Sequence, residues 1–144
     1  MSVQRYSFIL LSTILLVPSI AFGFLGNKYN YISASDLESR LASNKATSVV
    51  DIQVEEEFRQ HHINGAIPTY AYPVKSDSDR AKIDAAIEQV KDNTDPVVIV
   101  CPRGGGGAKR TYDYLLEQSI SEERLLILEK GQAGWPYTVL TENK

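Results

Sequence analysis

Cysteine and histidine are scarce in this sequence, and their scarcity excludes two classes of protein. The chain of 144 residues has one cysteine, Cys101, and therefore cannot form an internal disulfide. Its two histidines, His61 and His62, are adjacent, and adjacent side chains are poorly placed to chelate one metal ion from a helix or a strand. The sequence therefore predicts neither a disulfide scaffold nor a metal site, and no motif in it indicates a cofactor.

A surplus of positive charge is also lacking. The chain has 15 lysine and arginine residues against 18 aspartate and glutamate residues, which gives a formal net charge of −3 at pH 7. Proteins that bind nucleic acid usually carry a basic patch or stripe, so this composition argues against a nucleic-acid partner. No internal repeat divides the sequence, and its length suits one domain with a single core.

The N-terminal segment has the composition of a targeting sequence. Arg5 supplies a positive charge, residues 8–20 are almost wholly apolar, and Ala21 and Gly23 place small residues at alternate positions. We expect residues 1–23 to be a secretory signal peptide, and residues 24–144 to be a single domain that is exported to the periplasm or secreted. The alternative is an uncleaved membrane anchor, for which the apolar run is shorter than the roughly 20 residues of a spanning helix. No cysteine follows the small residues, which excludes lipid attachment there.

The rest of the chain alternates between strand patterns and helix patterns. Three short apolar runs predict buried parallel strands, at residues 48–52, 97–101 and 125–128. A capping-box pattern at residues 35–38 predicts the start of one helix, and apolar residues at helical spacing predict two more, at residues 77–90 and 108–118. This order predicts an α/β domain with a mainly parallel sheet and helices on both faces. Ligands of such sheets bind beyond the carboxyl ends of the strands.

A glycine-rich loop at the end of the 97–101 strand is the candidate site. The loop has the order Cys101, Pro102, Arg103, Gly104, Gly105, Gly106 and Gly107. Glycine adopts backbone conformations that other residues avoid, so its N–H groups can turn inward and form an anion-binding concavity. The helix expected from about Gly107 directs further N–H groups and the positive end of its dipole to the same place.

These features predict a thiolate that can carry sulfur. The N–H groups around Cys101 favour its ionised form and can hold the sulfonate end of thiosulfate, and then a persulfide anion. Arg103 adds a positive charge at the rim, and Pro102 stiffens the first step of the turn. We therefore expect Cys101 to be the nucleophile, with Pro102, Arg103 and the four glycines in the substrate-binding loop. The alternative is a tight strand-to-helix turn with no ligand.

Two other chemistries fail on spacing. A P-loop needs a lysine followed by serine or threonine, whereas Lys109 is followed by Arg110. A cysteine-dependent phosphatase loop, as known from that family, has an arginine six positions after the cysteine, where this chain has Gly107. Arg103 and Arg110 are both out of register, which argues against phosphate-ester hydrolysis.

Three segments, in order along the chain, resemble the rhodanese homology family over roughly residues 32–140. They are Val49-Val50-Asp51-Ile52 with Glu57-Phe58 and His62-Ile63-Asn64-Gly65-Ala66-Ile67, then Val98-Ile99-Val100-Cys101 with its loop, and finally Gly131-Gln132-Ala133-Gly134-Trp135. The resemblance implies a rhodanese-like α/β fold with a mainly parallel five-stranded sheet. It also implies a persulfide on Cys101, a thiosulfate-like small-molecule donor, and a thiol or cyanide acceptor.

The chain departs from the family pattern at three positions. Gln53 stands where an arginine is common, Gly106 stands where active loops often have an arginine, and His61 replaces a glycine. Several other residues near these segments have structural roles in our interpretation. We expect Asp51 to pair with nearby backbone, His62 to form a structural hydrogen bond, and Trp135 to lie in the core or the site wall. Tyr70, Tyr72 and Pro73 belong to a loop that is a candidate border of the site, and the sequence does not place them.

Three functions are compatible with these patterns. The first is an enzyme that transfers sulfur between small molecules through Cys101. The second is a sulfur carrier that accepts a persulfide and hands it to a protein acceptor without turnover. The third is an anion-binding or interaction domain, against which the intact Cys101 argues.

Overall fold

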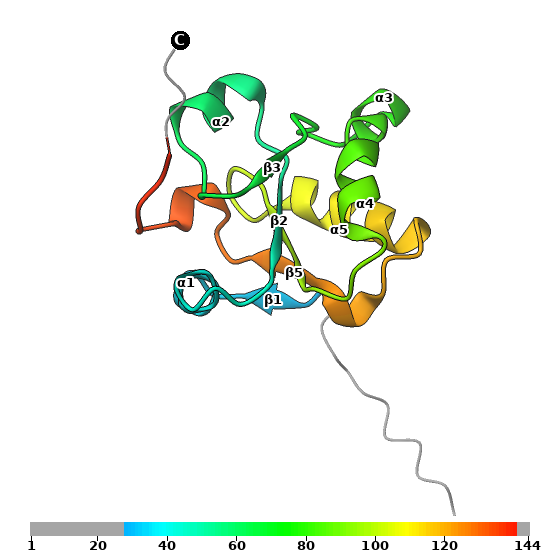
Figure 1. The fold of residues 1–144 in the computed structure, drawn as a ribbon. Coiled ribbons are helices and arrows are strands. Elements are labelled where there is room, and N and C mark those ends of the chain that lie inside the picture. The colour runs from blue at the N-terminus through cyan, green and yellow to red at the C-terminus, as the bar shows by residue number, and fades with distance from the viewer. Residues whose placement is uncertain (1–27, 141–144) are drawn as a thin grey trace, which may run out of the picture.

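The computed structural model describes residues 28–140, and the expected signal peptide lies outside them. One sheet runs through the described chain. Its strands are β1 (Tyr31–Ile32), β2 (Ser48–Asp51), β3 (Ile67–Pro68), β4 (Val97–Val100) and β5 (Leu125–Leu128). The strand order is β1-β5-β4-β2-β3, and every neighbouring pair is parallel (Figure 1). The predicted α/β class with a five-stranded sheet is confirmed.

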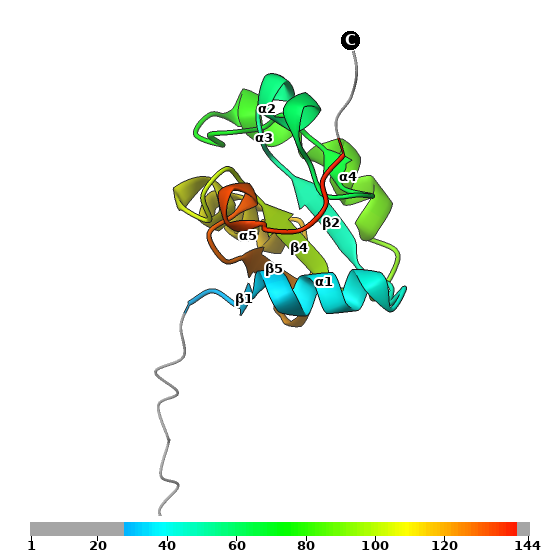
Figure 2. The same cartoon turned by 90° about the vertical axis from the view of Figure 1, so that its left-hand side faces the viewer.

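Helices cover both faces of this sheet, as predicted (Figures 1 and 2). The helices are α1 (Ala34–Ala42), α2 (Glu55–Gln60), α3 (Asp77–Ala81), α4 (Asp84–Val90) and α5 (Gly106–Glu117), with short 3-10 helices η1 (Glu122–Arg124) and η2 (Gln132–Gly134). Apolar side chains of α4 and α5 form one core with one face of the sheet. Leu37 of α1 and Trp135 form a second core with the other face. No helix within residues 28–140 has the length and apolar character needed to cross a bilayer.

The central strand β4 divides its side chains between the two cores. All four of its residues are buried, which explains its unbroken apolar sequence. Val97 and Ile99 belong to the core on the α5 side, whereas Val98 and Val100 belong to the core on the α1 side. Because side chains alternate along a strand, Cys101 falls on the α5 side, and it belongs to that core.

The helix expected over residues 77–90 is broken in the structure, so that expectation was wrong in one respect. The chain forms α3 and α4 as separate helices, with Lys82 and Ile83 between them. At the break, the N–H of Ile83 donates to the carbonyl of Arg80 at 2.8 Å, a tighter bond than the α-helical pattern. Ile83 is fully buried while α3 has no buried residue, so packing holds α4 alone against the sheet.

Element ends differ from the predicted ones by one or two residues. Helix α1 begins at Ala34, because Ser33 is its N-cap and accepts a hydrogen bond from the N–H of Asp36 at 3.1 Å. Strands β2 and β4 each end one residue before the predicted limit, and α5 begins at Gly106. The last difference places two of the loop glycines in the first turn of α5.

Candidate functional site

Cys101 lies at the carboxyl end of β4 and is the first residue of the loop that leads into α5. We call residues 101–105 the Cys101 loop. Cys101 is only 1% exposed, and the N–H of Gly104 donates to its Sγ at 2.9 Å. Gly104 has φ +71°, a conformation that glycine adopts at little cost and that aims this N–H back at the sulfur. The thiol is therefore buried but has a backbone donor directed at it.

Further N–H groups around the Cys101 loop have no acceptor in the part of the chain that the structure describes. Within residues 28–140, none is provided for the N–H groups of Gly105, Gly106, Gly107 and Ala108. Three of these residues form the first turn of α5, where N–H groups have no partner inside the helix. A helix N-terminus of this kind favours a bound negative charge. The loop glycines therefore supply backbone donors that a bound anion can use.

The turn that contains η2 fixes the opposite side of the Cys101 loop. The N–H of Gln132 donates to the carbonyl of Cys101 at 2.8 Å, and the N–H of Ala133 donates to the carbonyl of Pro102 at 3.0 Å. These bonds hold two carbonyl groups of the loop against η2. Gly131 makes the approach possible, because a Cβ there would overlap the Cys101 carbonyl oxygen and lie 2.8 Å from the Arg103 nitrogen.

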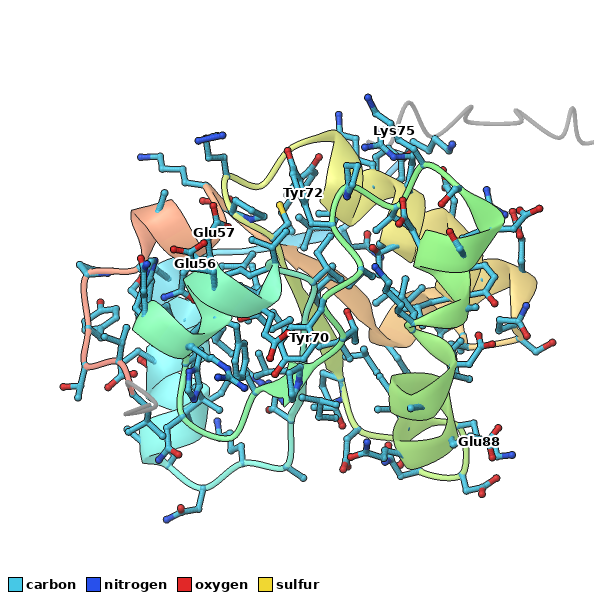
Figure 3. All side chains as sticks on the ribbon, turned by 90° about the horizontal axis from the view of Figure 1, so that it is seen from above. Glu56, Glu57, Tyr70, Tyr72, Lys75 and Glu88 are labelled. Carbon is cyan, nitrogen blue, oxygen red and sulfur yellow. The ribbon has the colours of Figure 1, made fainter. Side chains whose placement is uncertain are left out.

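Tyr72 packs against the first turn of α5. A Cβ placed on Gly107 would lie 3.0 Å from Cδ2 of Tyr72 and 3.2 Å from Cδ1 of Ile52, so only glycine fits here without a shift. Figure 3 shows Tyr72 beside the loop that leads into α5. Tyr70 lies elsewhere, with its ring edge-on to Phe58 at 5.8 Å.

Arg110 and Arg103 have different roles. The Arg110 guanidinium donates to the carbonyls of Pro73 and Val74, at 2.7 to 3.1 Å, and so binds the chain that follows Tyr72. Gly106 leaves room for it, because a Cβ there would lie 2.9 Å from Nη1 of Arg110. Arg103 is exposed and forms no hydrogen bond or ion pair within the described residues, so its charge is available at the loop.

A second buried polar group lies at the end of β2. Asp51 is fully buried and accepts hydrogen bonds from the N–H of Gln53 at 2.8 Å and from its side-chain Nε2 at 2.9 Å. Gln53 also donates to the carbonyl of His61 at 3.2 Å. Burial raises the pKa of Asp51 from 3.8 to about 6, because the hydrogen bonds from Gln53 only partly offset the loss of water.

His62 and Trp135 have the structural roles expected for them. His62 is buried, stacks on Phe58 with ring centroids 3.9 Å apart, and forms a hydrogen bond between Nδ1 and the Phe58 carbonyl at 2.8 Å. Trp135 is buried in the core on the α1 side. Within residues 28–140 no group of three potential ligands is arranged to hold a metal ion.

The structure brings most of the predicted site residues together. Gly104 contacts the sulfur, Gly105, Gly106 and Gly107 supply free N–H groups, and Pro102 is half-buried in the loop. Arg103 is exposed at the loop. Sequence reasoning left Tyr72 unplaced and missed the contacts of Gly131 and Arg110. The run of glycines was a signal for the contact of Tyr72, because Gly107 leaves the space against which its ring packs.

Comparison with known families identifies the domain. A family model described as a rhodanese-like domain matches residues 33–136. The chain belongs to the rhodanese-like domain family. No curated protein sequence matched this rhodanese-like domain.

Solved structures show the same fold at low sequence identity. A rhodanese-related protein from Thermoplasma volcanium is 20% identical, with a TM-score of 0.59, over 79% of this chain and 100% of that one. A rhodanese-like domain protein from Staphylococcus aureus is also 20% identical, with a TM-score of 0.57, over 79% and 99%. A yeast protein described as a tyrosine phosphatase of the rhodanese family is 16% identical, with a TM-score of 0.58, over 76% and 85%.

Proposed function

We propose that this rhodanese-like domain is a sulfurtransferase that carries sulfane sulfur as a persulfide on Cys101. The observation that carries the proposal is the N–H of Gly104 directed at Sγ from 2.9 Å. Unpaired N–H groups of the first turn of α5 follow directly after the Cys101 loop. Donors fixed in this way stabilise a thiolate, and they stabilise the anionic terminal sulfur of a persulfide without a separate base.

The proposed reaction has two steps. The Cys101 thiolate attacks the outer sulfur of thiosulfate, the S–S bond of the donor breaks, and sulfite leaves with the electron pair. The Cys101 persulfide then gives its terminal sulfur to cyanide or a small thiolate, which forms thiocyanate or a new persulfide and restores the Cys101 thiolate. This is covalent catalysis with ping-pong kinetics, in which the first product leaves before the acceptor reacts.

Phosphatase activity, which the description of the yeast neighbour names for that protein, is not proposed here. Position 107 is a glycine in contact with the ring of Tyr72. The arginine nearest along α5, Arg110, donates its hydrogen bonds to the carbonyls of Pro73 and Val74. The chain thus has no arginine in the register that a phosphate-binding cysteine loop uses.

Mass spectrometry after thiosulfate treatment tests the proposal. We expect the Cys101 peptide to gain the mass of one sulfur atom, and we expect cyanide to remove it with release of thiocyanate. Cys101→Ser should abolish both results, whereas Lys109→Ala, a change outside the loop, should retain them. An unmodified Cys101 peptide after thiosulfate would rule out the persulfide. Loading without turnover on cyanide would favour the sulfur carrier that serves a protein acceptor.

We also propose that the domain works outside the cytoplasm, in the periplasm or after secretion. The proposal rests on the leader pattern of residues 1–23. The donor is then a small sulfur compound present in that compartment.

A further inference from the structure

We propose that Tyr72, held in position by Arg110, limits the size of the molecule that can reach Cys101. The inference rests on the proposed function, because the role that it gives Tyr72 is to favour a small nucleophile over a protein cysteine as the sulfur acceptor. The contacts that carry it do not depend on sulfur transfer.

The position of Tyr72 is fixed from its backbone and from its ring. Its N–H donates to the carbonyl of Ile52 at 2.8 Å, at the end of β2. Its half-buried ring packs on the core that contains Cys101 and on the space left by Gly107, the second residue of α5. Figure 3 shows Tyr72 beside the loop that leads into α5. Tyr72 therefore forms an aromatic wall next to the free N–H groups of α5.

The chain around Tyr72 has an unfavourable backbone that needs external contacts. Tyr70 has φ +57° and Val74 has φ +60°, and the left-handed region is costly for a branched residue such as valine. Arg110 provides the contacts, through the hydrogen bonds from its guanidinium to the carbonyls of Pro73 and Val74. A planar guanidinium can hold two adjacent carbonyls at once, which a lysine cannot do in the same geometry.

Gly106 stands where active loops of the family often have an arginine, and it also lies next to the guanidinium that supports the chain around Tyr72. A Cβ at position 106 would lie 2.9 Å from Nη1 of Arg110, so the guanidinium would have to shift from its present position. The glycine that replaces the common arginine thus makes room for a different arginine, which supports the wall instead of extending from the Cys101 loop. Arg110 is a positioning residue in this scheme, and Tyr72 determines specificity.

The burial of Cys101 makes such a wall effective. The residue is 1% exposed, so a reagent or acceptor must pass its covering groups to reach Sγ. A rigid ring admits a thin nucleophile such as cyanide or a small thiolate. It obstructs a cysteine that is embedded in the surface of a protein.

Alkylation of Cys101 by two maleimides tests the wall without requiring sulfur transfer. N-methylmaleimide and N-(1-pyrenyl)maleimide share one reactive group and differ in size. We expect the wild-type protein to react far more slowly with the pyrenyl reagent. Tyr72→Ala should raise the pyrenyl rate roughly tenfold or more, the scale of discrimination in a packed pocket, and leave the methyl rate nearly unchanged. Tyr72→Phe keeps the ring and should keep the wild-type ratio of the two rates.

Arg110 supplies a second variant that leaves the wall residue in place. Arg110→Ala should raise the pyrenyl rate selectively, because the loop that carries Tyr72 loses its hydrogen bonds. Lys109→Ala removes the same charge from the neighbouring position of α5 and should have no effect on the ratio. Far-ultraviolet circular dichroism of each variant shows whether it is folded.

The outcomes separate this inference from the proposed function. A selective rise of the pyrenyl rate in either variant supports the wall, even if thiosulfate never loads Cys101. Equal rates for both reagents in the wild-type protein, or unchanged ratios in folded Tyr72→Ala and Arg110→Ala, would overturn it, even if sulfur transfer is found. Where transfer is found, Tyr72→Ala should also shift acceptor preference from cyanide towards glutathione.

Discussion

The buried carboxyl group of Asp51 shows how one substitution changes the charge balance at the end of β2. Gln53, which stands where the family pattern often has an arginine, gives Asp51 two hydrogen bonds but no positive charge. His62 lowers the pKa of Asp51 and Glu57 raises it, and both effects are smaller than that of burial. The carboxyl group consequently has a pKa of about 6, well above its ordinary value.

This shift predicts how stability depends on pH. A raised pKa in the folded state means that, from about pH 4 to pH 6, the folded protein binds more protons than the unfolded chain. The contribution of Asp51 is therefore fully present below pH 4 and is lost as the pH rises through 6. A difference of about two pKa units corresponds to at most about 3 kcal/mol. Urea unfolding from pH 4 to pH 7 should show this loss in the wild-type protein and a flatter profile in Asp51→Asn.

Asp77, an exposed aspartate at the start of α3, provides the matched control. Asp77→Asn should follow the wild-type profile. If Asp51→Asn also runs parallel to the wild-type protein across this range, the carboxyl group of Asp51 does not titrate there and the assignment fails.

Among the elements, the η2 turn and the Cys101 loop act as one unit. They are about thirty residues apart in sequence and are joined by backbone hydrogen bonds from Gln132 and Ala133. The close approach depends on Gly131, which has φ +57° and no room for a side chain.

Gly131→Ala should therefore destabilise the domain more than the same change at Gly105. The added methyl group meets the carbonyl of Cys101 and sits on a left-handed backbone, and we expect a loss of about 2–4 kcal/mol in the free energy of unfolding. Gly105→Ala, where no atom lies within 4 Å of a new Cβ, is the control and should change stability little. Denaturant unfolding of both variants measures the difference. Equal effects of the two changes would mean that η2 shifts to accommodate the added methyl group without a loss in the free energy of unfolding.

Prediction from sequence succeeded for elements whose own residues determine them. The β4 run from Val97 to Val100 is buried on both faces, so its composition alone revealed it. Strands β1 and β3 have two residues each and no pattern of their own, because their pairing partners define them. The break after α3 escaped prediction because the apolar periodicity begins only at Ile83, and nothing in residues 77–82 indicates that they form a separate helix. Only tertiary packing separates the exposed turn from the buried one.

The candidate site was predictable to a similar extent. The Cys101 loop is a contiguous run of unusual composition, and it could be found by inspection. The contacts of Tyr72 with Gly107 and of Arg110 with Pro73 join residues about 35 apart, and the bonds from η2 involve backbone atoms that every residue has. No single sequence indicates such pairs.

For the whole molecule, export stays a prediction that a direct measurement can check. The protein expressed from its full sequence in a bacterium should appear in the exported fraction with Phe24 as its first residue, because small residues precede that bond. N-terminal sequencing gives the answer. Gly23→Leu removes the small residue before the expected cut and should slow processing. An exported protein that still begins at Met1 would favour the membrane anchor.

The covering of Cys101 has a further consequence if the domain is exported, as proposed above, to an oxidising compartment. Unshielded thiols there join one molecule to another, and a chain with a single cysteine has no second one with which to protect it. Because only 1% of the residue is exposed, we expect that two copies do not bring their sulfur atoms within bonding distance. The purified protein should consequently migrate as a monomer in non-reducing electrophoresis after prolonged storage in air. Its thiol would then remain open to small molecules without forming a disulfide with a second copy of the chain.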